Sequence, residues 1–228
     1  MTVTHMITIS GAEYHLAGPG CLAPDARPVL IEDIAHHLSL INRFTGATIR
    51  PYSVAEHSLL CADIAHRMNL SPLVQLCALM HDAHEAYTSD LSSPAKIAVN
   101  CYSRGTGDCS AWGMFEDEHM KNVRRHFGML SAFAAQRQLV HEIDLQALAT
   151  ERHFLTGFDV KKNGPWKILR DGEGLPVPVA QWAQLDSAGR EETPWKQWRD
   201  DFLHRFHVLR LETDDAFNSR TAAARAVC

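Results

Sequence analysis

Apolar residues recur three and four positions apart along several segments of the chain, which is the spacing of one face of an α-helix. One such stripe begins near Ile31, and we expect its helix to close at Arg43. A second helix is expected to begin at Ser53, which precedes Glu56 by three residues as in a capping box. A third is expected after Ser71, because proline follows at the first helical position. The pattern therefore predicts a mainly helical protein.

The two ends of the chain depart from this pattern. Residues 6–16 alternate between apolar and polar around Gly11, which predicts a small β-hairpin ahead of the helices. Prolines favour an extended backbone over residues 175–180. A final helix is expected to start at the Thr193-Pro194 pair, because an aromatic stripe at helical spacing follows it.

Two histidines and one aspartate lie on apolar helix faces. His57 shares its face with Cys61, and His81 extends the apolar stripe of the next helix. Asp144 falls on the apolar face that starts at Val140. Burying an ionised carboxylate without a partner costs several kcal/mol, and an unpaired imidazole is also costly. Three inward polar positions on three helices therefore favour a shared ligand.

Asp82 directly follows His81 and is a fourth candidate ligand. His57, His81, Asp82 and Asp144 could together bind one divalent metal ion. Imidazole nitrogens and carboxylate oxygens suit Zn, Mn, Fe, Co or Ni better than Ca or Mg. The alternative is that the histidines are ordinary core residues, that Asp82 caps a helix, and that Asp144 lies at the edge of its stripe.

The order of these motifs resembles the HD-domain metal-dependent phosphohydrolases over roughly residues 29–155. The resemblance is carried by Ser53-Val-Ala-Glu-His57, Leu79-Met-His81-Asp82-Ala-His-Glu85-Ala, Asp90-Leu-Ser-Ser-Pro94-Ala-Lys96 and the late Asp144. The chain looks most similar to the compact bacterial HD-type 5′-deoxynucleotidases and to small phage HD enzymes that hydrolyse deoxynucleoside triphosphates such as dATP. The resemblance implies an all-helical fold, attack of metal-bound water on phosphorus, assembly as a homo-oligomer, and one catalytic metal on His57, His81, Asp82 and Asp144.

Together, pattern and resemblance predict one all-α domain over residues 1–228. This is an HD-domain helical bundle with a small N-terminal β-hairpin and an irregular C-terminal extension that ends in a helix. The expected core covers residues 29–155 and includes an inserted Gly-rich loop near residues 100–112. The extension is expected over residues 156–212 and a flexible tail over residues 213–228.

Two further carboxylates are candidates for catalysis. Glu85 lies four residues after His81 and three after Asp82, so it would share a helix face with them and serve as general acid or base. The alternative for Glu85 is a solvated helix residue. The resemblance places Asp90 at the nucleotide-facing site, where it would position the sugar or the catalytic water. The alternative for Asp90 is an ordinary turn residue.

Three residues are candidates for contacts with the nucleotide. The resemblance implies that Arg43 clamps a phosphate and that Phe44 lies against the base or sugar. A cation that favours the C-terminus of a helix is the alternative for Arg43. Lys96 would act as a point charge toward phosphate, or it is a surface lysine.

Some HD enzymes use additional histidines for a second metal. This chain has four histidines between the His-Asp pair and the last aspartate, namely His84, His119, His126 and His141. Their spacing departs from the two-metal pattern, so we expect a single metal, with these histidines at the surface or behind the ligands.

The composition of the chain favours some classes of ligand over others and indicates a cellular compartment. The 228 residues, 46% of them hydrophobic, suffice for one domain with a core. A net charge of −5 without a basic run argues against a nucleic acid polymer and favours a small-molecule nucleotide. Six cysteines without a C-x-x-C pair predict reduced thiols. No signal peptide or membrane-spanning run is apparent, so we expect a cytoplasmic protein without a membrane partner.

Three functional hypotheses follow from the sequence. The first is a 5′-deoxynucleotidase that releases phosphate from deoxynucleoside monophosphates. The second is a triphosphohydrolase that releases triphosphate from dNTPs with the same catalytic residues. The third is a nucleotide-binding module without catalysis, against which the complete set of ligands and Glu85 argue.

Overall fold

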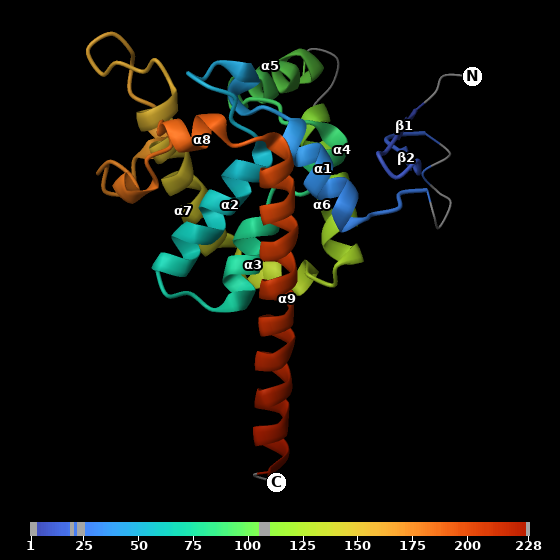
Figure 1. Cartoon of the computed structure of the whole chain (residues 1–228). Coiled ribbons are helices and arrows are strands. Elements are labelled where there is room, and N and C mark those ends of the chain that lie inside the picture. Colours follow the sequence, from blue (N-terminus) through green and yellow to red (C-terminus); the bar gives the residue numbers. More distant parts are fainter. Residues whose placement is uncertain (1–3, 19–20, 22–25, 105–109, 227–228) are drawn as a thin grey trace.

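The computed structural model describes residues 4–18, 21, 26–104 and 110–226, which form a helical body preceded by a two-stranded β-hairpin (Figure 1). The predicted fold class, mainly helical with a small N-terminal hairpin, is confirmed. The helices are α1 (Ile31–Leu40), α2 (Val54–Arg67), α3 (Pro72–Met80), α4 (Glu85–Thr88), α5 (Ser93–Arg104), α6 (Ala111–His126), α7 (Leu130–Leu155), α8 (Ala188–Glu192) and α9 (Trp195–Ala226). The short 3-10 helices are η2 (Arg43–Gly46), η3 (Lys167–Leu169) and η4 (Gln181–Ala183).

Helices α2 and α3 begin where the sequence predicts. The Oγ atom of Ser53 accepts a hydrogen bond of 3.2 Å from the backbone N–H of Glu56, which caps α2. The Glu56 carboxylate does not complete a capping box, because it binds the guanidinium groups of Arg50 and Arg190. Pro72 occupies the first position of α3. The two helices pack against each other and against α7. The beginning of α2 lies near the end of α3, because Nε2 of His57 is 3.3 Å from Nε2 of His81.

Helix α1 ends at Leu40, so the prediction that Arg43 closes this helix is wrong. The backbone of Ile41 is extended, and residues 41–43 form hydrogen bonds with residues 52–54. These bonds satisfy backbone groups that would otherwise continue the helix. Arg43 therefore begins the separate 3-10 turn η2 next to the start of α2.

The hairpin pairs β1 (His5–Ile7) with the antiparallel strand β2 (Glu13–His15). Its turn is attached to α1 through Asp33, whose carboxylate is buried. This carboxylate accepts hydrogen bonds of 3.0 Å from the N–H and 2.9 Å from the hydroxyl of Ser10. The hairpin is thus fixed to the helical body by directional bonds.

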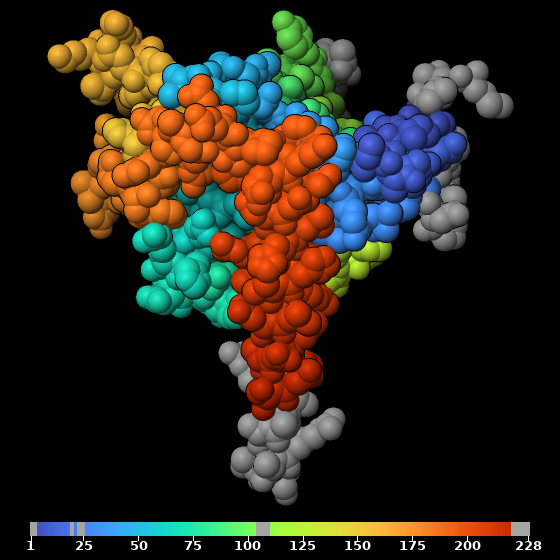
Figure 2. All heavy atoms as spheres, viewed as in Figure 1, coloured from blue at the N-terminus to red at the C-terminus, as the bar shows by residue number. Residues whose placement is uncertain are grey.

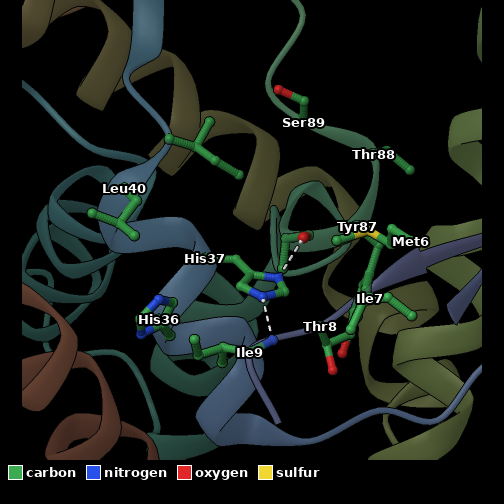
Figure 3. A pocket seen from close by; sticks show the side chains of 12 residues that line it. Met6, Ile7, Thr8, Ile9, His36, His37, Leu40, Tyr87, Thr88 and Ser89 are labelled. Atoms are coloured by element: carbon green, nitrogen blue, oxygen red, sulfur yellow. Dashed lines mark hydrogen bonds between the residues drawn. The ribbon is translucent and has the colours of Figure 1, made fainter. Parts of the chain in front are cut away.

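A second link joins the hairpin to α4 (Figure 3). The N–H of Ile9 donates to Nε2 of His37 at 3.2 Å, and Nδ1 of His37 donates to the carbonyl of Ala86 at 2.9 Å. The ring lines a cavity of about 550 Å³ between the hairpin, α1 and α4. Because Ala86 follows Glu85, this link also restrains the backbone beside a candidate catalytic residue.

Helix α9 packs across α1, α2 and α3. It buries Phe202, Phe206 and Leu209 in the core, which confirms these members of the predicted stripe. The C-terminal part of the helix extends away from the rest of the molecule (Figures 1 and 2). The helix continues to Ala226, so residues 213–226 are helical, whereas the expected flexibility of residues 213–228 stays a prediction. The segment contains no Gly or Pro and is rich in Ala, which favours a helix.

The chain between α7 and α9 is largely irregular, as expected, and contains η3, η4 and the short α8. Its residues Ala180, Ala183 and Leu185 are buried against apolar side chains of α2, α3 and α7. The extension therefore covers the helices that carry the candidate ligands.

Residues 100–104 were expected in an inserted loop near residues 100–112, but the structure places them in a helix. Residues 100–104 continue α5, and α6 begins at Ala111, while residues 105–109 lie outside the described residues. The side chain of Asn100 accepts a hydrogen bond of 3.1 Å from the N–H of Trp112, which helps to start α6.

The substitution Glu56→Ala is expected to lower the free energy of unfolding by about 3–5 kcal/mol. It would leave the guanidinium of Arg50, which is 2% exposed, without its carboxylate partner. Chemical denaturation would measure the change. Glu191→Ala, at an exposed position of α8, is the control and should change the stability by less than about 0.5 kcal/mol. Equal stability of the two variants would contradict the prediction.

None of the helices in the described ranges combines the length and the apolar character that crossing a membrane requires.

Candidate metal centre

Three segments bring the four predicted ligands together. His57 lies in the first turns of α2, His81 and Asp82 directly follow α3, and Asp144 lies in α7. Nε2 of His57 lies 3.3 Å from Nε2 of His81, 3.5 Å from Oδ2 of Asp82 and 3.4 Å from Oδ1 of Asp144. Nε2 of His81 lies 3.2 Å from Oδ2 of Asp82 and 3.6 Å from Oδ1 of Asp144. These atoms surround a common point.

The separations fit a shared metal ion. Transition metals bind nitrogen and oxygen ligands at about 2.0–2.2 Å, so neighbouring donor atoms lie about 3–3.5 Å apart in a tetrahedral or octahedral arrangement. The side chain of His57 is 0% exposed, whereas that of Asp144 is 33% exposed, so the cluster is closed on one side and open on the other. These side chains could therefore hold a metal ion that remains accessible to a ligand.

The two aspartates of the cluster have low pKa values. Burial alone would raise the pKa of Asp82, but the neighbouring His81 and His57 hold it well below its ordinary value. Burial also opposes ionisation of Asp144, and hydrogen bonds with the same histidines nevertheless hold its pKa below the ordinary value. Both carboxylates thus favour the charged form that binds cations.

Each histidine is oriented by a bond from its other ring nitrogen. Nδ1 of His57 donates to the buried carboxylate of Glu151 at 2.5 Å, and Nδ1 of His81 donates to the carbonyl of Ala78 at 2.8 Å. The Nε2 lone pairs are thereby directed at the candidate ion. Glu151 follows Asp144 by seven residues on α7, so helical spacing could have identified it from the sequence.

The substitution Glu151→Gln is expected to weaken metal affinity about 10- to 100-fold, because it removes the charged acceptor that orients His57. Titration of the metal against a chromophoric chelator would measure this loss. Glu142→Gln, at an exposed position of the same helix, provides the control and should retain full affinity. Unchanged affinity in Glu151→Gln would show that this carboxylate does not support the ligand.

Cys61 adds a sulfur to the cluster. Its Sγ atom lies 3.6 Å from Nε2 of His57, and the residue is fully buried. Donor atoms of His57, Cys61, His81 and Asp144 all lie within 4.8 Å of one another. The apolar pattern assigns Cys61 to the core, although its position four residues after His57 places both residues on one face of α2.

A cavity of about 350 Å³ opens over the exposed side of the ligands. Its wall includes His81, Asp82 and Asp144, and it also includes Arg124 from α6 and Arg137 from α7. Small-molecule sites in proteins commonly measure about 300–1,000 Å³. The cavity therefore has room for a compact ligand that reaches from the candidate metal to the two arginines.

Arg43 contacts the candidate ligands directly. Its guanidinium lies 3.4 Å from Asp82 and 3.3 Å from Glu151. The turn that carries it contains Phe44 and Thr45, both with φ of 55°, which is uncommon for residues other than glycine. Among the described residues, neither Arg43 nor Phe44 lines the cavity. Their predicted contacts with a nucleotide therefore stay predictions, and the structure shows Arg43 in contact with the carboxylates of Asp82 and Glu151.

Glu85 is buried beside the cluster and is 2% exposed. The helix face that was expected to carry Asp82 and Glu85 is interrupted, because α3 ends at Met80 and residues 81–84 form turns before α4. A hydrogen bond of 2.9 Å from the N–H of Glu85 to the carbonyl of Asp82 keeps the two residues adjacent. Burial raises the pKa of Glu85 well above its ordinary value, and the charges of Asp82 and Asp90 act in the same direction.

Lys96 belongs to a second polar cluster next to the ligands. Donor atoms of His84, Glu85 and Glu116 lie within 4.8 Å of one another. The ammonium of Lys96 lies 2.6 Å from Glu116 and 3.8 Å from Glu85. The lysine therefore neutralises these carboxylates, and its predicted contact with phosphate stays untested.

Asp90 is half-buried and follows Ser89, whose φ of 68° ends α4. Burial raises the pKa of Asp90, while the positive charge of Arg43 opposes this effect. The residue lies near the candidate centre but does not line the described cavity. Its role in positioning sugar or water stays a prediction.

Of the four histidines considered for a second metal, His84 lies with Glu85 and Glu116 in a group that could hold an ion, so the expectation of a single metal stays a prediction. Nδ1 of His119 accepts a bond of 3.0 Å from the hydroxyl of Tyr14, and its Nε2 donates to the carbonyl of Leu16 at 3.2 Å. Burial lowers the pKa of His119 to about 4. His126 ends α6 at an exposed position, whereas His141 is exposed and lines the cavity.

No family model matches the sequence. Two curated proteins are similar to it, and both are named as uncharacterized proteins. YfdR of Escherichia coli (strain K12) is 34% identical over 149 residues, which cover 65% of this chain and 70% of YfdR. RCAP_rcc00048 of Rhodobacter capsulatus is 42% identical over 142 residues, which cover 60% of this chain and 68% of that protein.

Proposed function

We propose that this chain, which belongs to the family of the uncharacterized proteins YfdR and RCAP_rcc00048, is a metal-dependent phosphohydrolase of nucleotides. The observation that carries the proposal is the convergence of His57, His81, Asp82 and Asp144, the last three of which line a cavity. A second support is the resemblance of the motifs around these residues to HD-domain phosphohydrolases.

The proposed cofactor is one divalent transition metal, namely Co, Mn, Zn, Ni or Fe. Mixed imidazole and carboxylate donors favour these ions, and the buried thiol of Cys61 adds a softer donor. When bound, such an ion lowers the pKa of water toward neutrality and neutralises charge on a phosphoryl oxygen.

The chain itself would then orient the substrate and move protons. Glu85 is buried next to Asp82 without being a ligand, so its carboxyl group can exchange a proton with the attacking water or the leaving oxygen. Arg43 holds Asp82 and Glu151 in place, and Glu151 in turn orients His57. Asp90 would help to position the sugar or the water.

Two substrate classes are compatible with this site. A 5′-deoxynucleotidase converts a deoxynucleoside monophosphate and water into deoxynucleoside and phosphate, and the sequence favours this reaction. A triphosphohydrolase converts a dNTP and water into deoxynucleoside and triphosphate. Arg124 and Arg137, which line the cavity, favour a substrate with more than one phosphate, and this favours the second reaction.

Product analysis tests the proposal. Purified protein would be incubated with Mn, Co or Zn and each dNMP, dNTP and ribonucleotide, and phosphate would be separated from triphosphate. Metal-dependent release of either product supports the proposed phosphohydrolase, and the product identifies the substrate class. Binding without turnover under all of these conditions would instead support the non-catalytic nucleotide-binding module.

A further inference from the structure

The turn between α6 and α7 brings two arginines to the lining of the cavity. Gly128, with φ of 68°, ends α6 in a left-handed conformation, and the N–H of Met129 bonds to the carbonyl of Arg124 at 2.8 Å. The chain then reverses into α7, which carries Arg137. Both side chains line the same cavity as His81, Asp82 and Asp144.

These two arginines differ from the other charged residues of the cavity. Lys96 is paired with Glu116, and Asp117 is paired with Lys121. Within the described ranges, neither Arg124 nor Arg137 forms a salt bridge or a side-chain hydrogen bond. A metal ion would neutralise Asp82 and Asp144, which leaves Arg124 and Arg137 as cations of the cavity that form no ion pair with a described side chain.

Arg124 is also held in a fixed position. Its guanidinium lies 3.9 Å from the centroid of the Phe133 ring, and its buried Nε has no hydrogen-bond partner among the described residues. Burial lowers the pKa of Arg124, and the like charge of Arg137 acts in the same direction. The charges of Asp82 and Asp117 act in the opposite direction, and an anion bound at the two arginines would oppose the effects of burial and of Arg137 further.

We propose that Arg124 and Arg137 form a second phosphate subsite, which binds the phosphates that extend beyond the one at the metal centre. The preferred substrate is therefore a nucleotide with a di- or triphosphate chain. Guanidinium groups suit this role because their planar donors bind two phosphate oxygens at once. This inference rests on the proposed function and specifies its substrate class.

The first test is equilibrium binding of inorganic triphosphate and of orthophosphate. Protein loaded with Mn and freed of unbound metal would be titrated calorimetrically, and its metal content would be measured before and after. Arg124→Gln and Arg137→Gln should each weaken triphosphate binding about 10- to 100-fold and leave orthophosphate binding within about threefold. Arg125→Gln, at an exposed neighbouring position of α6, is the control and should match the unmodified protein.

The second test compares kcat/KM for dNTPs and dNMPs in the same variants. The subsite predicts a loss of about 10- to 100-fold for dNTPs, with dNMP hydrolysis retained within about threefold. Equal losses for both substrates, or unchanged triphosphate binding in both variants, would overturn the inference while leaving the phosphohydrolase in place. Weaker triphosphate binding in a protein that hydrolyses no nucleotide would support the subsite and reject the proposed activity. Because Arg137 is exposed, its substitution remains informative even if Arg124→Gln fails to fold.

Discussion

Asp82→Ala is expected to lose bound metal and nucleotide hydrolysis together. The carboxylate of Asp82 lies 3.2 Å from Nε2 of His81 and 3.5 Å from Nε2 of His57, so it completes the candidate donor set. It also lies 3.4 Å from Arg43, whose charge would face the histidines without it. The expected result is metal content near zero and hydrolysis at the level of the protein-free control, measured by elemental analysis and product release.

Asp63→Ala provides the control for this result. Asp63 lies on α2, like His57, but its side chain is 36% exposed and pairs with Arg205. The control should retain metal and activity, because exposed ion pairs contribute little to stability. An Asp82→Ala variant with a full equivalent of metal would show that Asp82 is not a ligand. A variant with metal and full turnover would exclude it from the site.

Glu85→Gln is expected to retain metal but to lose about 10²- to 10⁴-fold in kcat. Glutamine preserves the size of the side chain in this buried position and removes the proton that a carboxyl group can exchange. Lys96 keeps its bond of 2.6 Å to Glu116, so the neighbouring ion network stays neutralised. Steady-state kinetics and metal analysis of the same preparation would measure both quantities.

For Glu85→Gln the matched control is Glu32→Gln, an exposed position on α1 that should behave like the unmodified protein. Loss of metal in Glu85→Gln would move this residue into the ligand set. Normal turnover with metal retained would remove it from proton transfer and leave the chemistry to other groups.

The starts of the helices and the candidate ligands were predictable from local features. Ser53 and Pro72 mark helix starts through properties of their own side chains, so they act in the same way in any fold. His57 and Asp144 stand out because polar groups interrupt apolar stripes. Each of these signals depends on a few residues that are neighbours in the sequence, so it is recognisable before the fold is known.

Features that depend on distant parts of the chain were not predictable in this way. The turn at Arg43 follows from hydrogen bonds between residues 41–43 and 52–54, and the sequence before Gly46 does not signal the left-handed conformation of Thr45. Arg124 and Arg137 occur on the polar faces of two separate helices. Their proximity depends on how α6 and α7 pack after the turn at Gly128.

The long helix α9 has two parts with different surroundings. Its first part is covered through Phe202, Phe206 and Leu209, whereas Leu211 is 66% exposed and Phe217 is 69% exposed. A helical segment that buries little apolar surface is only marginally stable in water. Amide hydrogens beyond Leu211 should therefore exchange with solvent much faster than those around Phe206, although the helix is continuous. Slow exchange over the whole of α9 would instead indicate that a second copy of the chain covers its exposed part.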